Sequence, residues 1–528
     1  MRKPTANPNE KLVNFGLIDL GRLALAIGFL VVIYIFVSGD ISGTSTNSTL
    51  LVMAAVIGGY MAMNIGANDV ANNVGPAVGS GALTLTGAIL IAIVCEAGGA
   101  IIAGGDVVNT IKKGIIDPDL IPDTQTFIWA MTAALLAAAI WLNAATYIGA
   151  PVSTTHSIVG GVLGAGIAAG GWAIADWGQV QKIVASWIIS PALGGIIAAA
   201  FLYAIKRSVY YKADMRGAAQ KMVPFLMAIM AWAFSTYLIV KGLKRIDLFK
   251  VDFIVAVGMG LAAAIIVFFF VTILLKKKSD SIENTREGID KLFMIPLIVS
   301  AAFLSFAHGA NDVANAIGPL AAINEAVIGG AIATKAAIPL WVMLIGAVGI
   351  AFGLALYGPK LIKTVGSEIT ELDKVRAFCV ALAAAITVII ASQLGLPVSS
   401  THIAVGGIFG VGFLREHLTS RYNENIGKIR KHMAEEDNED AVTIDAFIAR
   451  FDAASVPEKK QFLKELKQKA IKEELSWSQR RRFKKAYKAK LVERSMLFKI
   501  VLAWVITVPL TGFFAAGLFF MLRGMLLP

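Results

Sequence analysis

The chain has 528 residues, of which 57% are hydrophobic and only 16% are charged, and its mean hydropathy is +0.71. Soluble globular domains carry roughly 25% charged residues, so this composition excludes an ordinary soluble domain and indicates a membrane protein. The net charge of +12 does not predict nucleic-acid binding, because the basic residues lie in loops and in one polar segment between apolar stretches.

In chain order, thirteen apolar stretches come close to the ~20 residues that a helix needs to cross a bilayer. The predicted fold is therefore all-α, a polytopic membrane protein with about 12–13 transmembrane segments. Two of the stretches are short and glycine-rich, so re-entrant helices are an alternative to full spans at 152–171 and 399–414. The stretches lie near 17–37, 50–66, 82–105, 126–148, 152–171, 181–205, 222–240, 252–275, 292–308, 336–357, 375–394, 399–414 and 496–526.

The charges of the loops predict which side of the membrane each loop occupies. Basic residues concentrate in 206–221, 276–291 and 415–494, which the positive-inside rule places in the cytoplasm. The loop 38–50 has no basic residue and is predicted to lie outside, although the basic loop 241–250 falls outside in the same arrangement. The first apolar stretch has no convincing small-residue cleavage site and is predicted to be a retained helix.

One long polar segment interrupts the apolar pattern near the C-terminus, at 415–495. It contains the acidic run AEEDNED (434–440) and the basic run QRRRFKKAYKAK (479–490). We expect a solvated cytoplasmic insertion with a basic flank before the last span. A lipid-binding or regulatory helix near anionic headgroups is the alternative.

The sequence contains an internal repeat. Residues 66–76 read GANDVANNVGP and 309–319 read GANDVANAIGP, with nine of eleven positions identical at an offset of 243. A second pair follows in the same order, PVSTTH at 151–156 and PVSSTH at 397–402, at an offset of 246. Two unrelated polar motifs at nearly the same spacing indicate a tandem duplication.

Counting the predicted crossings suggests that the two repeats are inverted, an arrangement typical of secondary transporters. Seven crossings separate their starts, and a re-entrant 152–171 would change that parity. The predicted divisions are an N-terminal extension with one extra span, a first inverted repeat, linking helices and cytoplasmic loops, a second inverted repeat, the cytoplasmic insertion, and a last span that completes the second repeat. Their limits are 1–49, 50–206, 207–291, 292–414, 415–495 and 496–528.

The first motif carries charge into apolar surroundings. Asp69 and Glu96 are the only charged side chains between Leu50 and Gly105, and Asp312 repeats Asp69. Ionisable residues inside membranes are costly and usually mark a functional site. Carboxylate and amide oxygens suit Na⁺ or another hard cation. Glycines and prolines in both copies are expected to let the helix break and expose its backbone. The predicted cation ligands are Asn68, Asp69, Asn311, Asp312 and Glu96.

Glu96 has two interpretations. It is either a cation or proton site or the partner of a polar group elsewhere in the bundle. A gapped alignment of the two copies places Gly346 opposite it. His308 also has no polar counterpart, because Ile65 stands at its position in the first copy, and we assign it little weight.

The second motif predicts two helix N-termini, since a proline followed by Ser and Thr residues is typical of a first helical turn. Such N-termini attract anions through their free N–H groups and their dipole, and two of them facing each other would hold a tetrahedral oxyanion. His156 and His402 close the motifs and are expected to be packing residues more than ligands. Together with polar residues of the first motif, the predicted anion ligands are Asp69, Asn72, Ser153, Thr154, Thr155, Asp312, Asn315, Ser399, Ser400 and Thr401.

Neither motif contains Arg or Lys, so the charge of a bound anion must be balanced by helix dipoles, N–H donors and a co-transported cation. This favours symport. Phosphate at neutral pH still carries a P–OH group that can donate a hydrogen bond to Asp69 or Asp312. Sulfate has no such proton, so the carboxylates favour phosphate.

The doubled GANDVAN and PVS(T/S)TH motifs resemble the PiT family of inorganic phosphate transporters, over roughly 50–414 and the last helix. The stretch GPAVGSGALT is more similar to the sodium-coupled members. The resemblance implies a duplicated inverted architecture, Na⁺/phosphate symport and a homodimer. It places Asp69, Asn72, Asp312, Asn315 and the Ser and Thr residues of both PVS motifs at the substrate and ion sites. The extra N-terminal span and the polar insertion depart from the family pattern.

The sequence therefore predicts a non-enzymatic symporter that imports inorganic phosphate with Na⁺ across a plasma membrane, or an inner membrane in a bacterium, with no resident cofactor. Proton-coupled phosphate symport and sulfate transport are alternatives within the same family. A passive anion pore would move phosphate without cation dependence. A hydrolase is disfavoured because no G-x-S-x-G motif accompanies the Ser, His and Asp residues.

Overall fold

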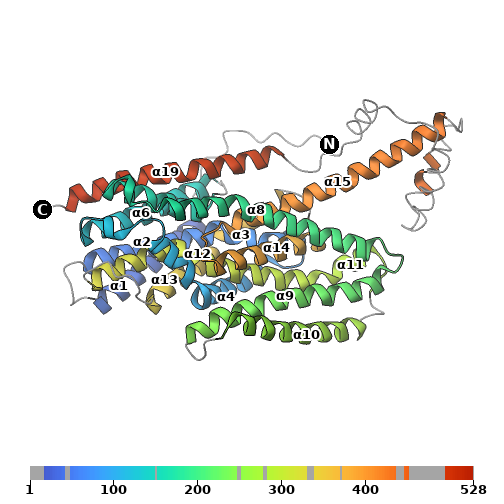
Figure 1. Cartoon of the computed structure of the whole chain (residues 1–528), viewed down its shortest axis with the longest axis horizontal. Coiled ribbons are helices and arrows are strands. Elements are labelled where there is room, and N and C mark those ends of the chain that lie inside the picture. The colour runs from blue at the N-terminus through green and yellow to red at the C-terminus, as the bar shows by residue number, and fades with distance from the viewer. Residues whose placement is uncertain are drawn as a thin grey trace.

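The computed structural model describes residues 17–41, 48–148, 152–246, 251–277, 282–329, 338–368, 372–435, 445–446, 448–450 and 494–526. In these ranges the chain is almost wholly helical, and its only β-type pairing is an isolated bridge between Ile116 and Ala175. The long helices lie roughly side by side in one bundle (Figure 1). The all-α prediction is confirmed.

The helices follow the predicted apolar stretches closely. Their bounds are α1 Leu17–Ile41, α2 Ser48–Asn68, α3 Val70–Gly79, α4 Leu85–Ala103, α5 Gly105–Lys113, α6 Thr124–Ile148, α7 Thr154–Gly170, α8 Trp177–Ile205, α9 Met215–Ile246, α10 Phe253–Lys277, α11 Arg286–Leu292, α12 Met294–Gly329, α13 Leu340–Glu368, α14 Lys374–Gln393, α15 Ser400–Glu435 and α19 Arg494–Leu526.

Eleven segments within the described ranges are long and apolar enough to cross a membrane. They match eleven of the thirteen predicted stretches. The other two, 152–171 and 399–414, form α7 and the beginning of α15. α7 has only 17 residues, which is at the short limit for a span.

Burial separates an outer layer of helices from an inner one. Only 17% of the apolar stretches of α1 and α10 is buried, against 83% for α14 and 72% for α12. A helix that is apolar all round and still exposed fits a hydrocarbon environment. The inner helices α2, α3 and α12 carry the two GANDVAN motifs, and α9 and α10 lie at one edge of the bundle (Figure 1).

The two copies of the first motif differ in their backbone. The helix is interrupted at Asp69, between α2 and α3, whereas α12 runs unbroken through Asp312 and Pro319. The interruption in the first copy is confined to Asp69, whose N–H still bonds to the Ile65 carbonyl at 2.9 Å, and the second copy has no interruption. In the second copy, a proline after the motif is accommodated inside a helix of 36 residues.

Close helix packing is repeated between the two halves. Gly66 of α2 abuts the backbone of Ile350 in α13, and Gly309 of α12 abuts the backbone of Glu96 in α4. Likewise Gly353 lies against Met63, as Gly99 lies against Phe306. α7 with α19 and α15 with α8 make a second such pair, because Gly164 meets Gly512 as Gly410 meets Gly195. Each half thus packs its helices on the other half.

This packing gives a better internal alignment than the sequence does. The contacts that Glu96 makes with Gly309 are made by Ile350 with Gly66. Ile350, and not Gly346, is therefore the structural counterpart of Glu96, and the carboxyl group of Glu96 is still present in one half only.

Basic residues from separate loops meet at one end of the bundle. Arg286, Arg376 and Arg415 all lie within electrostatic reach of Lys206, and α15 extends beyond the bundle to Glu435 (Figure 1). Most of the predicted insertion 415–495, including the whole basic run 479–490, lies outside the described residues, as do residues 1–16.

We expect Gly99→Ala and Gly353→Ala to destabilise the protein to a similar extent, because an added methyl group would collide with backbone atoms of the facing helix. Overpacking of this kind costs about 1–3 kcal/mol. The measurement is the unfolding temperature of the detergent-purified protein. Gly258→Ala in α10 is the control, because nothing lies near the added group; an equal loss there would contradict the packing explanation.

Candidate functional site

Two helix N-termini form one wall of the site, as the PVS motifs predict. α7 begins at Thr154, and the side chain of Ser153 accepts a hydrogen bond from the backbone N–H of His156 at 3.1 Å. α15 begins at Ser400, where Ser399 accepts from the N–H of His402 at 3.3 Å. Both serines are N-caps, which leaves the following Thr hydroxyls to face the interior.

The two N-termini meet at Asp69. The hydroxyl of Thr154 donates to Oδ2 of Asp69 at 2.7 Å, and the hydroxyl of Thr401 donates to Oδ1 at 3.1 Å. Asp69 lies where the chain leaves α2 and enters α3, and its side chain is buried. One carboxylate thus joins the first copy of the PVS motif to the second.

The asparagines of the two GANDVAN motifs cross between the halves. Asn72 donates to the Thr401 hydroxyl at 2.9 Å, and Asn315 donates to the Thr155 hydroxyl at 3.1 Å. These are equivalent contacts in the internal repeat. Asn315 also donates to Thr154 at 3.1 Å. The crossing brings four motifs, far apart in the sequence, to one place.

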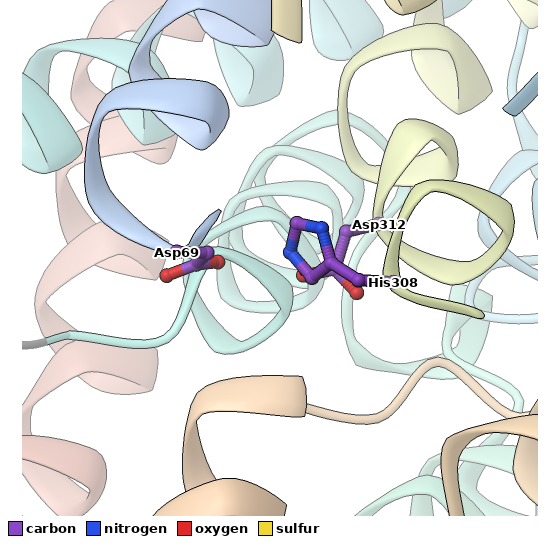
Figure 2. A group of neighbouring side chains, drawn as sticks. All are labelled: Asp69, His308 and Asp312. Atoms are coloured by element: carbon purple, nitrogen blue, oxygen red, sulfur yellow. The ribbon is translucent and has the colours of Figure 1, made fainter. Parts of the chain in front are cut away.

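Asp312 completes the cluster from α12. Its Oδ2 accepts a longer hydrogen bond from Thr154 at 3.3 Å and lies 3.2 Å from Nε2 of His308. Ligand atoms of Asp69, His308 and Asp312 all lie within 4.8 Å of one another. In Figure 2 the imidazole ring of His308 overlaps the carboxylate of Asp312, and the side chain of Asp69 faces them from the other side of the site. Carboxylate oxygens at this spacing suit a hard cation.

The predicted cation ligands Asn68 and Asn311 do not point at these carboxylates with their amide groups. Asn68 donates to the Thr146 hydroxyl of α6 at 2.8 Å, and Asn311 donates to the Ser392 hydroxyl of α14 at 2.9 Å. Both contacts are the same in the two halves. They anchor each motif to the helix behind it.

Glu96 is joined to the site through His308. Its Oε2 lies 2.6 Å from Nδ1 of His308, and its Oε1 accepts from Asn73 at 2.8 Å. The interpretation of Glu96 as the partner of a polar group across the bundle is the one that these contacts support. Sequence reasoning gave His308 too little weight. A buried carboxylate needs a polar partner, so Glu96 in an apolar stretch could have prompted a search for a residue such as His308.

The histidines of the PVS motifs pack as expected. The His156 ring packs at a tilt of 39° against Trp187 with ring centroids 3.8 Å apart, and the His402 ring stacks on Trp504 at 3.6 Å. The two histidine rings meet edge to face at 4.6 Å. Ser400 is buried, and its hydroxyl has no hydrogen-bond partner among the described residues.

Helix N-termini, hydroxyls and carboxylates that meet at the buried centre of a membrane-spanning bundle define a membrane transporter. The sequence profile of the "Phosphate transporter family" matches residues 65–515, and the chain belongs to this family. The predicted family and the absence of an enzymatic role are confirmed, because the relatives are permeases.

The relatives cover most of the chain. A protein of Helicobacter pylori strain J99 described as "Putative phosphate permease" is 52% identical over 510 residues, 95% of each chain. A protein of Thermococcus kodakarensis with the same description is 40% identical over 365 residues, 69% of this chain and 89% of its own. A solved structure titled "The sodium-dependent phosphate transporter" matches with a TM-score of 0.73 at 30% identity, covering 90% of this chain and all of that one.

We expect Thr401→Val to destabilise the protein and to impair phosphate uptake, because it removes the hydroxyl that joins Asp69 to Asn72. Leaving buried polar partners unpaired costs about 1–3 kcal/mol. Thr387→Val on α14 is the control, since its buried hydroxyl bonds only to its own helix. Equal uptake by the two variants at equal membrane levels would contradict a role for Thr401 in the site.

Proposed function

We propose that this protein is a secondary active symporter that imports inorganic phosphate together with Na⁺. The observation that carries the proposal is the meeting of Asp69 and Asp312 with the first turns of α7 and α15. Carboxylates supply ligands for a cation, and helix N-termini with free hydroxyls supply donors for an anion. The structural neighbour described as sodium-dependent supports Na⁺ as the cation.

Charge balance supports coupled transport. The site buries three carboxylates, on Asp69, Glu96 and Asp312, and among the described residues their ion pairs involve only His308. Even an imidazolium would leave two negative charges uncompensated. Adding a phosphate anion to this centre is costly without cations. Na⁺ bound at the carboxylates lowers that cost, and the two ligands therefore favour each other's binding.

The anion ligands that we propose are Asp69, Asn72, Thr154, Thr155, Asp312, Asn315 and Thr401, with Ser153, Ser399 and Ser400 at the two helix starts. The hydroxyls and amide groups donate hydrogen bonds to phosphate oxygens. A P–OH group of phosphate donates to a carboxylate, which sulfate cannot do. The proposed cation ligands are the carboxylates of Asp69 and Asp312. Asn68, Asn311 and Glu96 do not contact these carboxylates directly and are proposed to hold the surrounding helices and His308 in place.

We propose that the two halves are inverted repeats with the limits given above. α2 and α12 run antiparallel, because Gly58 of α2 faces Leu320 while Asp69 lies beside Asp312. The first helices of the two repeats therefore cross in opposite directions. The family resemblance supports a homodimer, and the loop charges support a plasma membrane, or bacterial inner membrane, with the segment 415–495 in the cytoplasm.

Uptake of labelled phosphate into proteoliposomes tests the proposal. An inward Na⁺ gradient is expected to drive accumulation that a K⁺ gradient does not, with weak competition from sulfate. Accumulation driven by a pH gradient alone would make the protein a proton-coupled phosphate symporter. Phosphate entry at the same rate with and without Na⁺, and never above the external concentration, would indicate a passive pore.

We expect Asp69→Asn and Asp312→Asn each to abolish Na⁺-driven accumulation, because each removes a negative charge from the proposed cation site. The amide keeps the size of the side chain, so membrane insertion is expected to persist. The measurement is uptake normalised to the amount of protein in the liposomes, and Asp176→Asn, at the exposed start of α8, is the control. Wild-type accumulation by both site variants would contradict the assignment.

A further inference from the structure

Three buried polar residues near the site have no polar counterpart in the internal repeat. Asn73 corresponds to Ala316, and His308 corresponds to Ile65, both at the offset of 243. Glu96 corresponds to Ile350 through the matching contacts with Gly309 and Gly66. The side chains of all three residues are fully buried. Thr154 and Thr401, which also touch the carboxylates, do have hydroxyl counterparts, Ser400 and Thr155, in the other copy.

These three residues form one continuous chain of contacts. Asn73 of α3 donates to Glu96 of α4 at 2.8 Å, and Glu96 lies 2.6 Å from Nδ1 of His308 on α12. The other ring nitrogen of His308 lies 3.2 Å from Oδ2 of Asp312, which is an ion-pair distance without hydrogen-bond geometry. The chain starts in the first copy of the GANDVAN motif and ends on the aspartate of the second copy.

The two aspartates consequently have different surroundings. Both oxygens of Asp69 accept hydrogen bonds from threonine hydroxyls. In Asp312, Oδ2 has both Thr154 and His308 beside it, whereas Oδ1 is buried without a hydrogen-bond partner among the described residues. A buried carboxylate oxygen left without a partner is costly. Such an oxygen is well placed to bind a cation.

We propose that Asn73, Glu96 and His308 form a positioning relay that fixes Asp312, directs its Oδ1 to the co-transported Na⁺, and so makes the second half of the site the primary Na⁺ half. This inference rests on the proposed Na⁺ coupling. The relay contacts Oδ2 of Asp312, and Oδ1 is the oxygen that binds Na⁺. Groups that orient a metal ligand from behind typically change affinity 10–100-fold when removed.

The test replaces the relay with the residues that the other half uses, in the triple variant Asn73→Ala, Glu96→Ile and His308→Ile. Removing all three together takes away Glu96 and His308 as a pair and leaves Asp312 with the hydrogen bond from Thr154, whereas His308→Ile alone would also strand Glu96. We expect the Na⁺ concentration for half-maximal uptake to rise about 10-fold or more. The phosphate half-saturation and the maximal rate at saturating Na⁺ are expected to stay near the wild-type values.

Glu96→Gln is the second variant, because it keeps the size of the side chain and the hydrogen bond from Asn73 while it loosens His308. It should shift the Na⁺ half-saturation in the same direction by a smaller factor. Ser305→Ala is the matched control. Ser305 lies one turn earlier on α12, is equally buried, and its hydroxyl has no hydrogen-bond partner among the described residues.

A second readout is the rise in unfolding temperature that Na⁺ alone produces in detergent. We expect the wild type and Ser305→Ala to show it and both relay variants to lose most of it. Wild-type protein with no Na⁺ dependence in either assay would overturn the proposed coupling ion together with the relay. A Na⁺-dependent wild type whose relay variants keep its Na⁺ half-saturation and its thermal shift would overturn the relay alone.

Discussion

The burial of Asp69 and Asp312 at the centre of a membrane-spanning bundle is the constraint on which the rest of this structure depends. Each carboxylate loses its hydration there, and only donors supplied by the protein or by a ligand can replace that hydration. The helix N-termini, the threonine hydroxyls and His308 all gather at this point for that reason. A carboxylate oxygen that lacks a donor from the protein is available to bind a cation.

The crossed contacts connect ligand binding to the relative position of the two halves. Asn72 reaches across to Thr401, and Asn315 reaches across to Thr155, so no half contains a complete site by itself. A ligand at the centre therefore binds both halves at once, and its affinity depends on how they are placed. Because binding free energies are linked, whatever Na⁺ contributes to phosphate binding, phosphate contributes to Na⁺ binding. Under the proposed Na⁺ coupling, each ligand lowers the cost of burying the other.

Much of this site follows from local sequence. The PVS motifs predict capped helix starts, and duplication predicts that Asp69 and Asp312 belong together; both features depend on short segments and on repetition. Contacts between distant helices could not be predicted in the same way. Asn68 turns to α6, α12 stays unbroken at Asp312, and Glu96 meets His308 across two helices. Each of these features depends on how distant helices pack against one another, and a short sequence motif does not contain that information.

The structure also suggests why a duplicated transporter keeps differences between its halves. A tetrahedral anion can be held by two equivalent helix starts, and the residues that provide them are nearly identical in both copies. A cation bound between two identical aspartates would have no preferred side. Buried residues differ between the copies, with Ile65 opposite His308 and Ala316 opposite Asn73. One oxygen of Asp312 has no hydrogen-bond partner among the described residues, while both oxygens of Asp69 accept from threonine hydroxyls. In the proposed symport, the repeated hydroxyls bind the anion, and the unrepeated residues beside Asp312 favour the cation.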